Sequence, residues 1–239
     1  MESSSLNKRF NIVNDDATNF LKFHLSANSI DVIFTSPDPI TNPHEYLHTL
    51  TILVDTVKRV LKPTGSMWVH MEDRFNEDGS LMRYPAKFSA DMVNCGWILR
   101  AERIWHAPVK DQNFYNEGRV IDNNRLILDH SYCFHFTQSR YGYYNTFEDF
   151  GGQPCSIFTE KQRILGPDEY ASAFSLELIK QCLLQTCPPG GTVLDPFCGS
   201  GSTGVVTITL GKGLSFIGVE KDARKTVATT ERLSRLRMS

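Results

Sequence analysis

The sequence lacks the features that mark several classes of protein. No apolar run approaches the roughly 18 residues that a transmembrane helix needs. The N-terminal residues, Met1 to Lys8, do not supply the apolar core of a signal peptide. We therefore expect no membrane segment and an intracellular location.

Patterns for disulfides and metal sites are also missing among the cysteines. The six are scattered along the chain without a C-x-x-C pair: Cys95, Cys133, Cys155, Cys182, Cys187 and Cys198. We interpret them as reduced thiols of an intracellular protein, most of them in the core. We also predict that the chain binds no metal.

Charges of opposite sign nearly cancel. Lys and Arg number 25 and Asp and Glu number 27, so the net charge of −2 gives no general attraction to nucleic acid. A nucleic-acid ligand would need a local basic face. The 239 residues, of which 41% are hydrophobic and 22% charged, fit one globular domain over residues 1–239.

Strand-like and helix-like segments alternate along this chain. Strands are expected at residues 10–13, 30–35, 65–71, 97–105, 128–136, 192–194 and 214–219. Helices are expected at 17–25, 44–61, 84–94, 174–183 and 203–210, with a basic helix that ends near 236. Residues 107–124 and 144–168 are predicted to be irregular. The alternation predicts an α/β fold with a mainly parallel sheet and helices on both faces.

One glycine-rich loop stands out near the C-terminal end. Residues 192–204 (TVLDPFCGSGSTG) combine a short strand, a tight turn and the start of a helix, which can hold an anionic or nucleoside ligand with backbone N–H groups. Its glycines spell G-x-G-x-x-G, and Glu220 follows sixteen residues after Gly204. Alone, this pattern does not distinguish a dinucleotide from another nucleoside cofactor.

A second loop lies far upstream. The strand Ile30–Thr35 runs directly into Ser36-Pro37-Asp38-Pro39, where two prolines fix a stiff turn. In open parallel sheets, ligands bind at the carboxyl edge, where such loops lie.

Together the two loops resemble the signatures of the permuted β class of DNA amino-methyltransferases. These are a catalytic loop, Ser, Asp or Asn followed by Pro-Pro-aromatic, and a cofactor loop, D-P-F-x-G-S-G. Family members carry the catalytic loop first, and this chain has the same order. The resemblance extends from about Phe10 to Leu236 through further segments: Asn14-Asp15-Asp16, Leu61-Lys62-Pro63-x-Gly65, Ile104-Trp105, Phe136-Thr-Gln-Ser139 and Phe216-Ile-Gly-Val-Glu220.

The resemblance implies a fold and a cofactor. The fold would be the Rossmann-like fold of methyltransferases dependent on S-adenosylmethionine (SAM), circularly permuted, with a mainly parallel seven-stranded sheet and an antiparallel edge. The SAM-binding residues would be Asp16, Phe174, Asp195, Pro196, Phe197, Gly199, Ser200, Gly201 and Glu220. Within this set, Asp195 would face the cationic end of the methionine moiety. Glu220 would accept hydrogen bonds from both ribose hydroxyls.

Four of the proposed cofactor contacts have simpler alternatives. Asp16 lies near the adenine amine by resemblance, but it could equally cap a turn. Phe174 could pack against the cofactor or in the core. Asp195 and Glu220 could be solvated strand ends, although their spacing favours the cofactor role.

The catalytic residues implied by the resemblance are Ser36, Pro37, Asp38 and Pro39. The Ser36 hydroxyl and the Pro37 carbonyl would orient the target amine by accepting its hydrogens. The chain departs from the family here, because Asp38 replaces the second proline and Pro39-Ile40 replaces the aromatic that stacks on a flipped base. An alternative register would begin the motif at Asp38. In either register the stacking ring must come from elsewhere, with Tyr46 and Trp68 as candidates.

Three functions follow from these patterns. The first is a SAM-dependent DNA methyltransferase acting on an exocyclic amine. Serine in the first motif position favours cytosine N4 over adenine N6. The second is a relative that binds SAM or DNA but is catalytically impaired, which the altered motif would suit. The third is a nicotinamide-dependent oxidoreductase, which the literal glycine pattern allows but no recognisable hydride-transfer residue supports.

DNA is the expected partner, and family members place their target-recognition insert where residues 144–168 lie. Here that region is short. A positive face could be built from Lys110, Arg119, Arg125, Arg140, Lys161 and Arg163, with Tyr115, Tyr141, Tyr143 and Tyr144 beside it. Relatives are commonly dimers, so a homodimer is left open, as is a restriction partner. The protein would reside in the cytoplasm, or in a nucleoid or viral factory.

Overall fold

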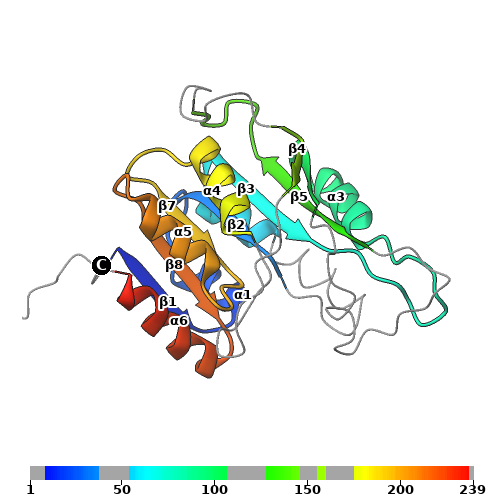
Figure 1. Cartoon of the computed structure of the whole chain (residues 1–239). Helices are drawn as coiled ribbons and strands as arrows, with labels where there is room; N and C mark the ends of the chain where they lie inside the picture. The colour runs from blue at the N-terminus through cyan, green and yellow to red at the C-terminus, as the bar shows by residue number, and fades with distance from the viewer. Residues whose placement is uncertain (1–8, 38–53, 107–127, 146–154, 160–174, 237–239) are drawn as a thin grey trace, which may run out of the picture.

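The computed structural model describes residues 9–37, 54–106, 128–145, 155–159 and 175–236. These residues form an eight-stranded sheet in the order β1-β8-β7-β2-β3-β5-β4-β6 (Figure 1). The strands are β1 (Phe10–Asn14), β2 (Ile30–Thr35), β3 (Leu61–Met71), β4 (Ile98–His106), β5 (His130–Thr137), β6 (Ile157–Thr159), β7 (Thr192–Asp195) and β8 (Ser215–Glu220). The helices are α1 (Ala17–Phe23), α3 (Tyr84–Asn94), α4 (Leu176–Thr186), α5 (Ser202–Leu210) and α6 (Ala223–Arg235), and residues 54–60 are also helical.

The sheet is mainly parallel. Among the described strands only β5 runs against its neighbours, pairing antiparallel with both β3 and β4. The other pairs, β1·β8, β8·β7, β7·β2, β2·β3 and β4·β6, are parallel. The predicted fold class is therefore confirmed, with the antiparallel strand lying inside the sheet and not at its edge.

The eighth strand lies in a segment that we predicted to be irregular. Ile157, Phe158 and Thr159 form β6 and pair in parallel with Ile104, Trp105 and His106 of β4. Three residues are too short to show a periodicity, and glycines and prolines on both sides favoured a loop. The β-branched and aromatic side chains were the only local signal for a strand.

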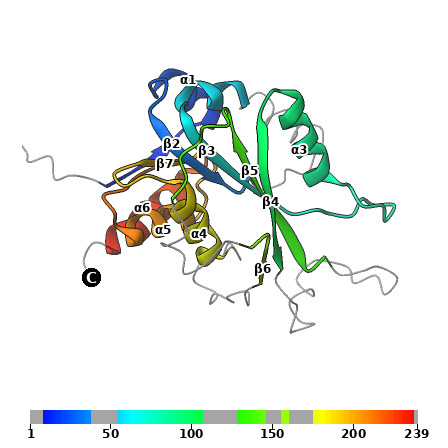
Figure 2. The same ribbon diagram turned by 90° about the horizontal axis from the view of Figure 1, so that it is seen from above.

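Helices cover both faces of the sheet (Figure 2). The core on one face joins α1, the helical residues 54–60 and α3 to the sheet, with Leu21, Val57 and Phe88 buried there. The core on the other face contains Ile179 of α4, Val206 of α5 and Leu233 of α6. The central strand β2 is buried at every position, which accounts for its continuous apolar run.

None of the described helices combines the length and apolar character needed to cross a membrane.

Parallel strand directions bring distant segments to one edge. The carboxyl ends of β1, β8, β7, β2 and β3 meet there, together with the amino end of β5. Ser36 follows β2 and Pro196 follows β7, so the two loops singled out by the sequence lie at the same edge. We call this the carboxyl edge.

Gly204 allows α5 to approach β8 closely. A Cβ atom at this position would lie 2.6 Å from Cε1 of Phe216 and 2.8 Å from Cδ1 of Leu233. Both neighbours are fully buried, so neither can move aside without disturbing the core. The last glycine of the pattern is therefore required for packing.

We expect Gly204→Ala to lower the free energy of unfolding by about 1–2 kcal/mol, measured by urea denaturation. Overpacking a core typically costs about 1–3 kcal/mol, and the gain in helix propensity of up to about 1 kcal/mol offsets only part of it. Gly142→Ala is the matched control, because its new Cβ would make only ordinary contacts of 3.5 Å or more. Equal stability of the two variants would contradict this packing account.

Candidate functional site

Asp195 is a buried carboxylate at the end of β7. Its Oδ1 accepts hydrogen bonds from Thr35 Oγ1 at 2.9 Å and from the Phe197 backbone N–H at 3.1 Å. Its Oδ2 accepts one from Thr203 Oγ1 at 2.7 Å. One side chain therefore ties together the end of β2, the turn after β7 and the first turn of α5.

Burial raises the pKa of Asp195 to about 6. Hydrogen bonds from Thr203, Thr35 and the Phe197 amide oppose that rise, and the Glu220 carboxylate adds to it. Only 4% of Asp195 is exposed. Its hydrogen bonds to Phe197 and Thr203 place the carboxylate beneath the glycine loop. The expected contact with the methionine moiety stays a prediction.

The glycine loop needs residues without a side chain. Gly199 and Gly201 have φ values of 51° and 81°, in the left-handed region that favours glycine. A Cβ on Gly201 would meet Thr229 of α6 at 2.5 Å. Helix α6 also holds the loop by hydrogen bonds, from Thr229 Oγ1 to Gly199 O at 2.7 Å and from Arg232 to Ser200 O at 2.8 Å.

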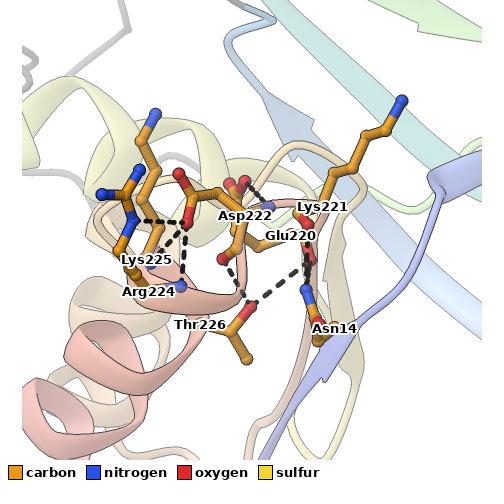
Figure 3. A network of polar contacts seen from close by, with 7 residues as sticks. All are labelled: Asn14, Glu220, Lys221, Asp222, Arg224, Lys225 and Thr226. Atoms are coloured by element: carbon orange, nitrogen blue, oxygen red, sulfur yellow. Dashed lines mark hydrogen bonds and ion pairs between the residues drawn. The ribbon is translucent and has the colours of Figure 1, made fainter.

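Glu220 lies at the end of β8, beside this loop. Its Oε2 accepts the Gly199 N–H at 2.9 Å and its Oε1 accepts the Asp222 N–H at 2.8 Å. Figure 3 shows the turn after β8, where Asn14 of β1 donates to the backbone oxygens of Glu220 and Lys221. The carboxylate is half-buried and keeps lone pairs for further donors.

The remaining predicted cofactor residues occupy different positions. Asp16 is exposed and caps α1, accepting the N–H groups of Thr18 and Asn19 on one carboxylate oxygen. This is the capping role that we left open, and it occupies only Oδ1. Pro196 and Phe197 line an apolar hollow between the sheet and α3. Phe174 lies outside the described residues.

Ser36 begins the predicted catalytic loop and lies at the carboxyl edge. Its Oγ lies 2.9 Å from Nδ1 of His70 on β3, and His70 Nε2 lies 2.7 Å from Ser131 Oγ on β5. Pro37 is buried. Asp38 and Pro39 lie outside the described residues, so the choice between the two registers stays a prediction.

Trp68 cannot supply the missing stacking ring. It is fully buried, stacks on His135 with ring centroids 4.2 Å apart, and donates from Nε1 to Thr186 Oγ1 at 3.0 Å. The proposal of Trp68 is therefore wrong, because a central strand carries this side chain into the core. Tyr46, the other candidate, lies outside the described residues.

Part of the predicted basic face lies at the edge of the sheet opposite the carboxyl edge. Arg140, Tyr141, Tyr143 and Tyr144 follow the end of β5, and the Tyr143 N–H donates to Thr64 O near the start of β3. These four residues therefore lie at the edge where β3 begins, away from Ser36, and the basic face as a whole stays a prediction. The antiparallel direction of β5 places them there. Lys110, Tyr115, Arg119, Arg125, Lys161 and Arg163 lie outside the described residues.

No three His, Cys, Asp or Glu side chains among the described residues gather to hold a metal ion. Residues 44–48 spell H-E-x-x-H, a zinc-binding pattern when it lies on a helix, and the expectation of no metal wrongly took this pattern to be absent. These residues fall outside the described part of the chain. The expectation of no metal therefore stays a prediction.

Sequence reasoning missed the residues that hold the site together. They are Thr35, His70, Ser131, Thr203, Thr229 and Arg232. Thr35 precedes the catalytic motif and Thr203 lies within the glycine-rich loop, so polar side chains there were a usable signal. The others come from β3, β5 and α6, and nothing local marks them as parts of the site.

A mainly parallel sheet, a strand–glycine turn–helix and an acidic residue ending the next strand define an α/β protein built to bind a nucleoside cofactor. Comparison with known families is more specific. The family model described as DNA methylase, of N6 and N4 methyltransferases, matches residues 10–228. The chain therefore belongs to this family of DNA amino-methyltransferases.

Individual relatives agree with this assignment. The type II methyltransferase M.SmaI of Serratia marcescens is 25% identical over 232 residues, which cover 82% of this chain and 76% of the relative. The PvuII cytosine-N4-specific DNA methyltransferase superposes with a TM-score of 0.80 at 18% identity, covering 93% of this chain and 86% of that one. A DNA modification methylase from Thermus thermophilus, solved with SAM, gives a TM-score of 0.72 at 22% identity, covering 95% of both chains.

The raised pKa of Asp195 predicts a pH dependence of stability. The native protein holds this proton more tightly than the unfolded chain, so the contribution of Asp195 is most favourable below pH 4. It declines by up to about 3 kcal/mol as the pH rises to 6. We expect Asp195→Asn to gain stability relative to the wild type between pH 4.5 and 7, measured by urea denaturation.

Asp222→Asn is the matched control with the opposite sign. Backbone hydrogen bonds from Arg224 and Lys225 lower the pKa of the exposed Asp222. The wild type should gain relative to this variant only as the pH rises toward about 4, and between pH 4.5 and 7 the stability difference between them should stay constant. If the stability difference between the wild type and Asp195→Asn is the same at pH 4.5 and at pH 7, the account is contradicted.

Proposed function

We propose that the chain transfers the methyl group of SAM to an exocyclic amine of a DNA base, and that this amine is cytosine N4. One observation carries the proposal. The 2.9 Å hydrogen bond between Thr35 and Asp195 joins residues 160 positions apart and holds the start of the catalytic loop beside the glycine loop. Donor and acceptor of a methyl group could therefore meet at the carboxyl edge.

The cofactor would lie across the ends of β7 and β8. Gly199 and Gly201 would let its methionine moiety approach the backbone, and Glu220 would accept the ribose hydroxyls with its remaining lone pairs. Asp16 has a second carboxylate oxygen available for the adenine amine. Phe174 stays a candidate for packing against the cofactor. Asp195 would support the loop from below.

Methyl transfer from a sulfonium is a direct displacement. The amine nitrogen attacks the methyl carbon, the sulfur–carbon bond breaks toward sulfur, and the amine then releases one proton to solvent. Because the leaving group needs no protonation, the protein's main task is to aim the nitrogen lone pair. Ser36, which accepts an amine hydrogen in this scheme, and the Pro37 carbonyl would do so.

The choice of base rests on Ser36. A first-position serine resembles the cytosine-N4 branch, and the PvuII enzyme, whose fold this chain shares, is cytosine-N4-specific. Adenine N6 is the alternative. The altered residues Asp38 and Pro39 also allow a relative that binds SAM without transferring its methyl group. The domain boundaries at 1–239, the recognition role of residues 144–168 and a homodimer stay proposals as well.

The experiment is incubation of the protein with methyl-labelled SAM and DNA of varied sequence, followed by mass analysis of the nucleosides. We expect N4-methylcytosine. N6-methyladenine instead would contradict the choice of base and leave the reaction class intact. If SAM binds but no methyl is transferred, the enzyme claim fails. Activity gained by joint Asp38→Pro and Pro39→Tyr substitutions would then identify an impaired relative.

Ser36→Ala should lower kcat by about 100-fold to 1000-fold and leave SAM affinity unchanged. Without the Ser36 hydroxyl oxygen the target amine is no longer oriented toward the methyl group, while the glycine loop that binds SAM is unchanged. Ser89→Ala on α3 is the matched control, since its hydroxyl donates to Ala86 O of its own helix and, among the described residues, has no bond to the site. Normal turnover by Ser36→Ala would show that the motif begins elsewhere.

Glu220→Gln should weaken SAM binding by about 10-fold to 100-fold in calorimetric titration, because hydrogen bonds to a charged acceptor contribute about 1.5–3 kcal/mol. Glu231→Gln, an exposed carboxylate on α6, should leave the affinity unchanged. Unaltered SAM affinity in Glu220→Gln would contradict the ribose assignment. Preferential binding of NAD by the wild type would overturn the cofactor itself.

A further inference from the structure

A chain of three polar side chains runs inward from the catalytic loop. Ser36 Oγ contacts His70 Nδ1 at 2.9 Å, and His70 Nε2 contacts Ser131 Oγ at 2.7 Å. The three residues come from the end of β2, from β3 and from β5. The antiparallel direction of β5 brings Ser131 to this edge of the sheet.

His70 is held as a neutral imidazole. It is 4% exposed, and its ring lies 5.7 Å from that of Trp105. Burial lowers its pKa to about 3. At neutral pH one ring nitrogen therefore carries a proton and the other accepts one.

The two tautomers give Ser36 opposite roles. With the proton on Nε2, His70 donates to Ser131 and accepts the Ser36 O–H at Nδ1, so the Ser36 lone pairs are available to a ligand. With the proton on Nδ1, His70 occupies a Ser36 lone pair, and the Ser36 proton must point elsewhere. An exocyclic amine presents N–H donors, and only the first arrangement turns the hydroxyl fully into an acceptor.

We propose that His70 is a positioning residue, which accepts the Ser36 hydroxyl proton at Nδ1 while Ser131 holds Nε2, and so aims the Ser36 lone pairs at the target amine. This inference rests on the proposed function. His70 takes no proton in the reaction, since the proton released by the methylated amine goes to solvent. The group acts through Ser36 and does not touch the substrate.

A double-mutant cycle on methyl transfer tests the inference. We expect His70→Leu to lower kcat by about 10-fold, the equivalent of one hydrogen bond, with SAM affinity unchanged in calorimetry. In a Ser36→Ala background the same substitution should cost nothing more, because it acts through the missing hydroxyl. If the double variant instead loses kcat by the product of the two single-variant losses, the two residues act independently and the proposal is overturned.

A conservative variant and a matched control separate positioning from folding. His70→Asn keeps an acceptor near Nδ1 and should recover most of the activity lost in His70→Leu. If the leucine variant does not fold, the cycle is run with His70→Asn and His70→Ala. His135→Leu is the control, a buried histidine on β5 whose Nε2 lies 2.9 Å from Ser66 Oγ, away from Ser36. The His135→Leu variant should have a lower free energy of unfolding than the wild type and an unchanged kcat.

The pH profile gives an independent outcome. A neutral His70 predicts no change in kcat from its ionisation between pH 5.5 and 8. A fall in kcat below pH 6.5 that disappears in His70→Asn would make His70 a base and overturn the proposal. Absence of methyl transfer by the wild type would overturn the proposed function and this inference together. Multiplicative factors in the cycle would overturn this inference alone.

Discussion

The site depends on one buried carboxylate, Asp195, whose hydrogen-bond partners among the described residues carry no positive charge. Asp195 leaves water almost completely, and three donors from Thr35, Phe197 and Thr203 offset part of the cost. Because the Thr35 and Thr203 hydroxyls come from different elements, the same bonds that satisfy the charge also fix the ends of β2 and β7 and the start of α5. Both loops at the carboxyl edge are anchored to this group, so their relative position follows from it.

The two halves of the site are supported differently. The glycine loop is fixed by backbone bonds to Glu220 and by Thr229 and Arg232 of α6, while β8 is clamped to β1 through Asn14. Ser36 instead connects through His70 to β3 and β5 by side chains alone. The glycine loop is thus held through its own backbone groups, whereas Ser36 is held through its side chain. The position of Ser36 therefore depends more on individual residues.

The sequence was sufficient for the fold and for the two loops. Continuous apolar runs such as Ile30–Thr35 and helical spacing such as that in α4 have strong local signals, and the elements predicted there agree with those observed. The predicted helix at 44–61 is observed only over residues 54–60, because β3 already begins at Leu61 and residues 44–53 lie outside the described part of the chain. Local signals could not reveal partners brought in by strand pairing. Ser131 reaches the site only because β5 is antiparallel, and for the same reason Arg140 and Tyr141 leave it. The short strand β6 had too few residues for any periodicity, and the burial of Trp68 follows from the central place of β3.

The central claim is that one rim of the sheet presents a sulfonium methyl group to a target amine beside Ser36. A crystal structure of the protein with sinefungin, in which a carbon bearing an amino group replaces the methyl-bearing sulfur of SAM, tests it most directly. The account predicts that Glu220 binds the ribose hydroxyls and that the amino-acid tail of sinefungin lies over Gly199 and Gly201. It also predicts that the amino group standing in for the methyl points toward Ser36. A ligand bound elsewhere, or one whose amine points away from the catalytic loop, would contradict it.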